Sequence, residues 1–220
     1  MSTRAGRPSR LSRAQIVAVA RDLVAAHGVE ALTMRRLAAE LSATPMAVYR
    51  HVRDKDELLL LLLDDLAAGL RRPALPDDPR ARIVAVALAM HAALAEVPWI
   101  VEVLTGDDLL SRSALWYTEA IVDAATACGA DADEAVYVYR TIWYYTAGEL
   151  LVRAAATRRG TGRVTFRDKV FSDIDAEALP RLAALGESYV TLAARDTYER
   201  GLRALVTGLL GPGDTDAPPP

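Results

Sequence analysis

The 220-residue chain contains one cysteine and no long unbroken apolar run. The single cysteine, Cys128, excludes an internal disulfide framework and a zinc site built on several cysteines. The leucine run from Leu58 to Leu63 ends at two aspartates, whereas a membrane-spanning helix needs about 20 apolar residues. The first 20 residues carry arginines but lack the apolar segment of a signal peptide. We therefore expect a cytoplasmic protein without a membrane partner.

Strand signals and catalytic motifs are equally scarce. No run of β-branched residues alternates with polar residues between turn signals. The three histidines, His27, His51 and His91, are scattered along the chain. The chain lacks an HExxH motif, a glycine-rich phosphate loop and a nucleophile elbow. The sequence therefore predicts an all-α protein that is not an enzyme, with no cofactor and no metal site.

Charge is divided unevenly along the chain, although the formal net charge is only −3. Residues 1–56 carry ten lysines and arginines against five acidic residues, a net charge of +5, whereas residues 57–220 carry −8. A basic N-terminal module on an acidic body favours contact between the N-terminus and a polyanion such as DNA. A solubilising surface with chance asymmetry would explain the same numbers.

Four helix-start signals follow one another in the N-terminal quarter. Ser12 and Gln15 form a capping box with Leu11 and Ile16 as its hydrophobic staple, and Gly28 suits the end of that helix. The later starts have N-caps at Thr33, at Thr44 (followed by Pro45) and at Asp54. The two middle helices are short, and only two residues separate the first of them from the next N-cap. Two short helices between two longer ones predict a helix-turn-helix.

Three segments of this region have a characteristic order and spacing: residues 32–41 (LTMRRLAAEL), 44–52 (TPMAVYRHV) and 54–59 (DKDELL). Together they resemble the TetR family of bacterial transcriptional regulators. The detailed likeness covers about residues 10–66, and the remainder is similar in length, helicity and helix order. The resemblance implies an N-terminal helix-turn-helix DNA-binding domain, a C-terminal helical ligand-binding and dimerisation domain, and a homodimer on a palindromic operator.

The expected domains follow from this organisation. Three prolines between residues 71 and 79 favour a boundary there. Helices are expected at about residues 79–97, 99–104, 108–128 and 131–156, then a mobile loop at 157–175 and one or two helices at 176–210. We expect a disordered basic arm (1–10), the DNA-binding domain (11–56), a connecting helix (57–71), the ligand-binding and dimerisation domain (76–210) and a disordered tail (211–220).

The resemblance also assigns DNA-binding roles. It implies phosphate contacts from Thr33, Tyr49 and Lys55. Short or apolar side chains such as Met46 suit a thymine methyl, whereas Arg50 suits a guanine or a phosphate. The arginines at positions 4, 7 and 10 could enter a minor groove or remain a solvated tail. The expected DNA-binding residues are Thr33, Arg35, Thr44, Pro45, Met46, Ala47, Tyr49, Arg50, His51 and Lys55.

Two residues depart from the family pattern. Ser42 occupies the turn position where the family often has glycine, so we expect a left-handed residue there that costs roughly 1 kcal/mol. Val52 replaces a common phenylalanine and removes some core volume. Neither change alters the expected DNA-binding role.

Small and aromatic residues form stripes on two of the later helices. Glycine inside a helix costs about 1 kcal/mol relative to alanine, so its presence indicates close packing. The family implies a four-helix bundle made of two helices from each protomer, and the alternative is packing within one protomer. The stripe on the predicted helix at 131–156 also contains Tyr137 and Ala155. The expected dimerisation residues are Tyr144, Gly148, Leu151, Tyr198, Gly201, Leu205 and Gly208.

Aromatic residues concentrate in the C-terminal part, where all three tryptophans and seven of eight tyrosines follow residue 98. They could line a cavity for a small molecule or form plain core. His91, Glu102 and Glu149 could anchor a ligand or form buried hydrogen bonds and salt bridges. The candidate ligand-binding residues are Met90, His91, Leu94, Trp99, Leu104, Trp116, Tyr117, Ala120, Tyr139 and Trp143.

The expected mechanism is that of a repressor. The free dimer occupies a palindromic operator. A small, largely apolar or aromatic effector favours a conformation in which the distance between the two recognition helices no longer matches the half-sites. The helix from Asp54 to Leu70 joins the two domains and is the expected lever. An activator of the same fold, and a helical interaction protein without specific DNA binding, are the alternatives.

Overall fold

The computed structural model describes residues 11–106, 109–159, 166–186 and 188–211. Within these ranges it contains helices and no strand, which confirms the all-α prediction. The basic arm and the tail beyond Gly211 lie outside the described residues. The elements are α1 (Arg13–His27), η1 (Val29–Ala31), α2 (Met34–Glu40), α3 (Pro45–Tyr49), α4 (Lys55–Gly69), α5 (Pro79–Ala95), α6 (Pro98–Gly106), η2 (Arg112–Ala114), α7 (Leu115–Ala127), α8 (Ala132–Arg159), α9 (Phe166–Ser172), α10 (Pro180–Leu185), α11 (Ser188–Ala193) and α12 (Tyr198–Leu210).

The four predicted N-caps form. Ser12 and Gln15 make the reciprocal capping box of α1. The side chains of Thr33, Thr44 and Asp54 each accept a hydrogen bond from the backbone N–H three residues later. Such a cap stabilises a helix by typically about 1 kcal/mol, which matters for helices as short as α2 and α3.

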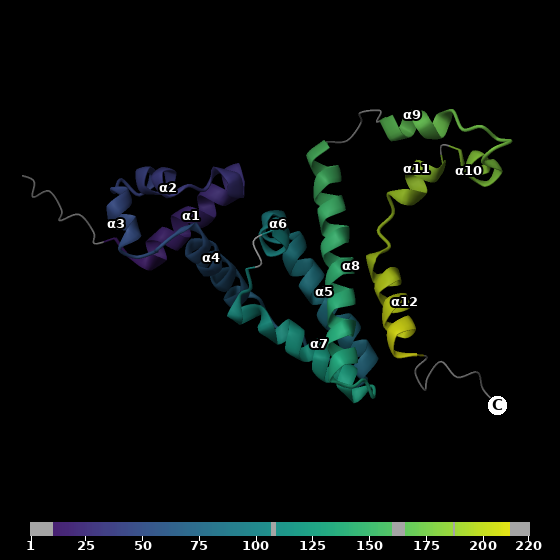
Figure 1. Cartoon of the computed structure of the whole chain (residues 1–220), viewed down its shortest axis with the longest axis horizontal. Helices are drawn as coiled ribbons and strands as arrows, with labels where there is room; N and C mark the ends of the chain where they lie inside the picture. Colours follow the sequence, from purple (N-terminus) through teal and green to yellow (C-terminus); the bar gives the residue numbers. More distant parts are fainter. Residues whose placement is uncertain (1–10, 107–108, 160–165, 187, 212–220) are drawn as a thin grey trace, which may run out of the picture.

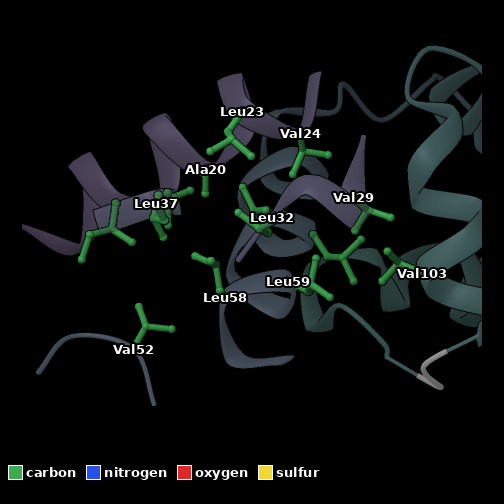
Figure 2. Close-up of a cluster of buried hydrophobic side chains, with 14 of the residues drawn as sticks. Ala20, Leu23, Val24, Val29, Leu32, Leu37, Val52, Leu58, Leu59 and Val103 are labelled. Atoms are coloured by element: carbon green, nitrogen blue, oxygen red, sulfur yellow. The ribbon is translucent and has the colours of Figure 1, made fainter. Parts of the chain in front are cut away.

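One hydrophobic core holds α1 to α4 together. Leu37, Val48 and Leu58, from α2, α3 and α4, are completely buried in it. Figure 2 shows the side chains of this cluster converging, with Val103 of α6 at its edge. Ile100 of α6 belongs to the same cluster. The core of the DNA-binding part therefore includes residues from the C-terminal part of the chain.

A second core joins α5, α7, α8 and α12. Its fully buried members include Ile83, Ile121, Ile142 and Leu202, one from each of these helices. A smaller cluster lies between α6 and α8. Leu94, near the end of α5, packs against all three clusters and so lies at their junction.

The segment after α8 differs from the prediction. The expected loop at 157–175 is partly helical, because α8 continues through three alanines to Arg159 and α9 covers Phe166–Ser172. The end of α8 is about one turn beyond the predicted end at Ala156, and arginine is a good helix former. Residues 176–210 form three helices rather than one or two. Figure 1 shows α9, α10 and α11 to the right of the C-terminal end of α8.

The predicted helix at 108–128 also begins later than expected, at Leu115. The carboxylate of Asp64 in α4 accepts hydrogen bonds from the Ser111 hydroxyl at 2.6 Å and from the Ser113 N–H at 3.4 Å. These tertiary bonds hold the chain at the start of η2 against α4.

Among the described residues, no single helix has both the length and the apolar composition to cross a membrane. The pair Pro79–Ala95 and Pro98–Thr105, bent by 106° at the break, meets these criteria only when taken together.

Candidate DNA-reading surface and effector cavity

A tight turn sets the angle between α2 and α3. Ser42 has φ 51°, the left-handed conformation predicted from its position. Its N–H donates to the Ala39 carbonyl at 3.0 Å, and the Ala43 N–H donates to the Ala38 carbonyl at 2.9 Å. These bonds satisfy the end of α2 and compensate for the roughly 1 kcal/mol that a side chain costs in this conformation.

The predicted DNA-binding residues surround this turn on the outer side of α2 and α3. Val48 points inward and is fully buried, whereas Met46 is 67% exposed and Tyr49 is 46% exposed. Such large exposed side chains on a five-residue helix are available to a partner. Of the ten predicted residues, Thr33, Arg35, Thr44, Pro45, Met46, Tyr49 and Arg50 are exposed, and Ala47, His51 and Lys55 are half-buried.

The caps leave hydrogen-bonding capacity on this surface. The Thr33 hydroxyl accepts from the Arg36 N–H at 3.2 Å, and the Thr44 hydroxyl accepts from the Ala47 N–H at 3.3 Å. A hydroxyl that accepts one bond still has its own hydrogen to donate. Each threonine can therefore cap a helix and bind a phosphate oxygen at the same time.

Basic side chains divide into two groups. Arg13 pairs with Glu57 at 2.6 Å, Arg53 pairs with Glu57 at 3.2 Å, and Arg21 pairs with Asp65 at 2.8 Å, so these three are tied to acids of α4. Within the part of the chain that the structure describes, Arg35, Arg36, Arg50 and Lys55 form no such ion pair. The second group lies in the helix-turn-helix or at the start of α4, and its charges are available for a polyanion.

Glu57 connects α1, α4 and the chain that leads from α3. Its carboxylate accepts from the Arg53 N–H at 2.7 Å and from the Arg13 guanidinium. The Arg53 backbone hydrogen bond is the main reason why the pKa of Glu57 is lowered from its ordinary value of 4.5, with Arg53 and Arg13 charges adding to it. Asp54 and Glu57 have the spacing of a capping box, but Glu57 accepts from the N–H of Arg53, the residue before the N-cap.

A lowered pKa predicts the pH dependence of this link. Ionised Glu57 stabilises the fold above pH 4.5, and the contribution is lost as pH falls through the lower folded-state pKa. We expect Glu57→Gln to lower the urea midpoint at pH 7 and to lose this effect progressively as the pH falls below 4.5. Urea titrations of both proteins across this range measure the difference. A gap that does not narrow in acid would contradict the assignment.

A cavity of about 370 Å³ lies between α4 and the helices α5 to α8. This volume is within the range of small-molecule sites. Six of the ten predicted ligand-binding residues line it, namely Met90, Leu94, Leu104, Tyr117, Tyr139 and Trp143. Burial raises the pKa of the Tyr117 phenol, so this wall keeps a neutral hydroxyl. Glu96 is the one charged residue among the described lining.

The other four candidates have different surroundings. Trp99 packs against the core of α1 to α4, and Ala120 packs into the core of the body. Trp116 stacks on Tyr117 with ring centroids 4.0 Å apart, and the Arg72 guanidinium lies 5.4 Å from its ring centroid. His91 stacks on Tyr198 at 3.9 Å and meets Glu149 at 2.7 Å. None of the four is among the described lining.

Sequence reasoning missed the contribution of α4 to the cavity. Leu63, Leu66, Ala67 and Leu70 line one wall. Leu63 and Leu66 also pack in the core of α1 to α4, so one apolar face of α4 serves that core in its first turns and the cavity in its later turns. This apolar face continues beyond the leucine run to Leu70, and that signal could have identified the wall.

Acidic residues of α6 and α8 form ion pairs. Glu149 accepts from the Arg153 Nε at 2.7 Å as well as meeting His91, and Arg153 reaches Asp196 at 3.1 Å. Glu102 pairs with Arg158 at 2.5 Å. The structure therefore gives both glutamates the salt-bridge role that the sequence left open.

Two family models match separate parts of the sequence. The model described as bacterial regulatory proteins, tetR family, matches residues 16–62, and the tetracyclin repressor-like C-terminal domain matches residues 72–211. The chain belongs to the TetR family. Its fold also resembles the TetR-family protein ActR of Streptomyces coelicolor crystallised with actinorhodin, with a TM-score of 0.79 and 24% identity over 94% of this chain and 99% of the other.

Two curated TetR-family relatives illustrate the range of similarity. The transcriptional repressor DrrR1 of Streptomyces coeruleorubidus is 34% identical over 149 residues, which are 64% of this chain and 55% of the relative. The class A tetracycline repressor from transposon 1721 of Escherichia coli is 27% identical over 208 residues, 91% of each chain. The chain spans about half the length of the first curated relatives that it matches.

The predicted dimerisation residues of this TetR-family chain fall into two groups. On α8, Tyr144 is 58% exposed, Gly148 is exposed and Leu151 is half-buried. On α12, Leu205 is half-buried and Gly208 is exposed, but Tyr198 and Gly201 face the protomer's own interior. Tyr198 meets the Thr146 hydroxyl at 2.7 Å, and burial raises its pKa to about 12. The structure therefore places these last two in the intramolecular packing that was the alternative.

Proposed function

We propose that this chain is a ligand-responsive transcriptional repressor that works as a homodimer in the cytoplasm. In this proposal α3 of each protomer enters the major groove at one half-site of a palindromic operator. A small, largely apolar or aromatic effector in the cavity between α4 and α6 releases the DNA. The name of the repressor DrrR1 supports repression rather than activation, and the proposal assigns the chain no catalysed reaction.

The observation that carries the proposal is that α4 and α6 contribute side chains both to the core of α1 to α4 and to the cavity. Leu63 of α4 and Ile100 of α6 belong to the core that holds α1 to α4 together, here called the DNA-reading core, and they also line the cavity. An effector that moves either side chain must change the packing under α1 to α3. The Asp64 to Ser111 hydrogen bond ties the same stretch of α4 to the cavity wall. Coupling then requires only that the effector prefer one arrangement of these contacts.

The cavity lining indicates the effector's chemistry. Leucines, Trp143 and two tyrosines suit a planar apolar body, and Ser111, Thr118 and the tyrosine hydroxyls can each form a hydrogen bond. Glu96 disfavours an anion. We therefore expect a neutral or cationic effector.

A footprint on the DNA that flanks the gene tests the proposal. At near-physiological salt, we expect the purified protein to protect a palindrome, and a neutral aromatic compound that fits the cavity to abolish the protection. Salt-sensitive binding to every sequence without a footprint would contradict specific repression and favour the general interaction protein. Transcription that falls when the protein is removed would favour an activator.

The proposed phosphate contact of Lys55 predicts a change in salt dependence. We expect Lys55→Ala to weaken binding to all sequences and to reduce the slope of log affinity against log salt by about 0.9 per half-site. Fluorescence anisotropy from about 50 to 200 mM salt measures the slope. An unchanged slope would remove Lys55 from the contact surface.

A further inference from the structure

A second cavity of about 310 Å³ lies between the end of α5, the start of α6 and the last turns of α8. Leu94, Ala95 and Pro98 form one side, and Leu150 and Ala154 form another. Three polar residues complete the lining: Arg153, Thr157 and Arg158. The walls are therefore apolar, and both charged residues among the described lining are arginines.

The two cavities differ in charge although they share a wall. Leu94 lines both, but the first cavity has Glu96 as its charged residue and the second has two arginines. A single apolar ligand class would not need this division. The second cavity therefore offers guanidinium groups that the described lining of the first lacks, although each guanidinium also pairs with an acid outside the lining.

The two arginines differ in how strongly the protein engages them. Arg153 is held by both Glu149 and Asp196. Arg158 bonds Glu102 through Nη1, and the two side chains are 62% and 38% exposed. Such an exposed ion pair contributes little stability. A guanidinium has five N–H donors, so one such bond leaves donors for an incoming anion.

We propose that this second cavity binds a small amphipathic anion, with its apolar body between α5 and α8 and its carboxylate or sulfonate on Arg158. Glu102 competes for the same guanidinium. Since Glu102 lies on α6, which supplies Ile100 and Val103 to the DNA-reading core, an anion that displaces it acts on the helix that also lines the first cavity. A test of anion binding needs no operator DNA, so the two proposals can fail separately.

A pair of dyes with the same aromatic body provides the probe. Anilinonaphthalene sulfonate carries the anion and phenylnaphthylamine does not, and both fluoresce more strongly in apolar surroundings. We expect Arg158→Gln to weaken binding of the sulfonate dye about fivefold, the scale of an exposed ion pair, and to leave the neutral dye unchanged. Glu102→Gln removes the competitor and should tighten binding of the sulfonate dye about twofold.

Matched variants distinguish dye binding in the cavity from dye binding elsewhere on the protein surface. Arg203 and Glu199 form a similarly exposed pair on α12, so Arg203→Gln and Glu199→Gln should leave both dyes unaffected. Ala154→Leu fills the cavity and should abolish the Arg158-dependent part of the affinity. The proposal is overturned if Arg158→Gln has no more effect than Arg203→Gln. It is also overturned if the Arg158 dependence survives in Ala154→Leu.

Discussion

Replacing Arg50 with alanine is expected to weaken operator binding by about 1 to 3 kcal/mol per half-site, or about 2 to 6 kcal/mol for a dimer on a palindrome. Arg50 follows the last residue of α3, is exposed, and forms no ion pair within the described residues. Its guanidinium is therefore available to pair with a guanine edge or a phosphate. A bidentate contact to guanine would give the upper part of the range.

The effect must be measured on a panel of operators with single base changes, because two roles predict different patterns. If Arg50 reads a base, the variant loses its preference at one position in each half-site. If it binds phosphate, affinity falls uniformly across the panel. Arg21→Ala is the matched control, since Arg21 is engaged with Asp65 of α4 and its loss should leave affinity within about threefold, as for other exposed pairs. Unchanged binding by Arg50→Ala would exclude both roles.

The signals that sequence reasoning handled well are local. The four N-caps depend on residues within four positions of one another, whereas the left-handed Ser42 was implied by the family's turn position, and all five are present. The aromatic concentration after residue 98 also pointed to a cavity wall, because bulky side chains from α7 and α8 meet there. Each of these features can be predicted without knowing which helix packs on which.

The features that sequence reasoning could not predict depend on which helices pack against each other. A stripe of Tyr198 and Gly201 is equally suited to a dimer face and to the protomer's own core, and only the position of α8 decides. Likewise, the sequence showed that α4 is apolar but not that its first turns cover the first core and its later turns line the cavity. His91 illustrates the same limit, since its partner Glu149 is 58 residues away.

The packing of Gly201 predicts a large loss of stability from a very small change. A Cβ at this position would lie 2.0 Å from the Tyr145 hydroxyl oxygen and 2.8 Å from its ring carbon Cζ. Tyr145 cannot simply turn away, because its ring stacks on Tyr198 at 5.2 Å and its hydroxyl donates to the Tyr198 carbonyl at 3.3 Å. We expect Gly201→Ala to lower the free energy of unfolding by about 1 to 3 kcal/mol, the usual cost of overpacking.

Two further variants make this result specific. Gly208 lies on the same helix with nothing within 4 Å of its added Cβ, so Gly208→Ala should gain up to about 1 kcal/mol from helix propensity alone. Tyr145→Phe removes the nearest clashing atom and should recover part of the loss when combined with Gly201→Ala, as a double-mutant cycle measures. Urea unfolding at fixed protein concentration gives the free energies of the wild type, the three single variants and the double variant. Equal effects of alanine at positions 201 and 208 would mean that α12 does not pack closely on Tyr145.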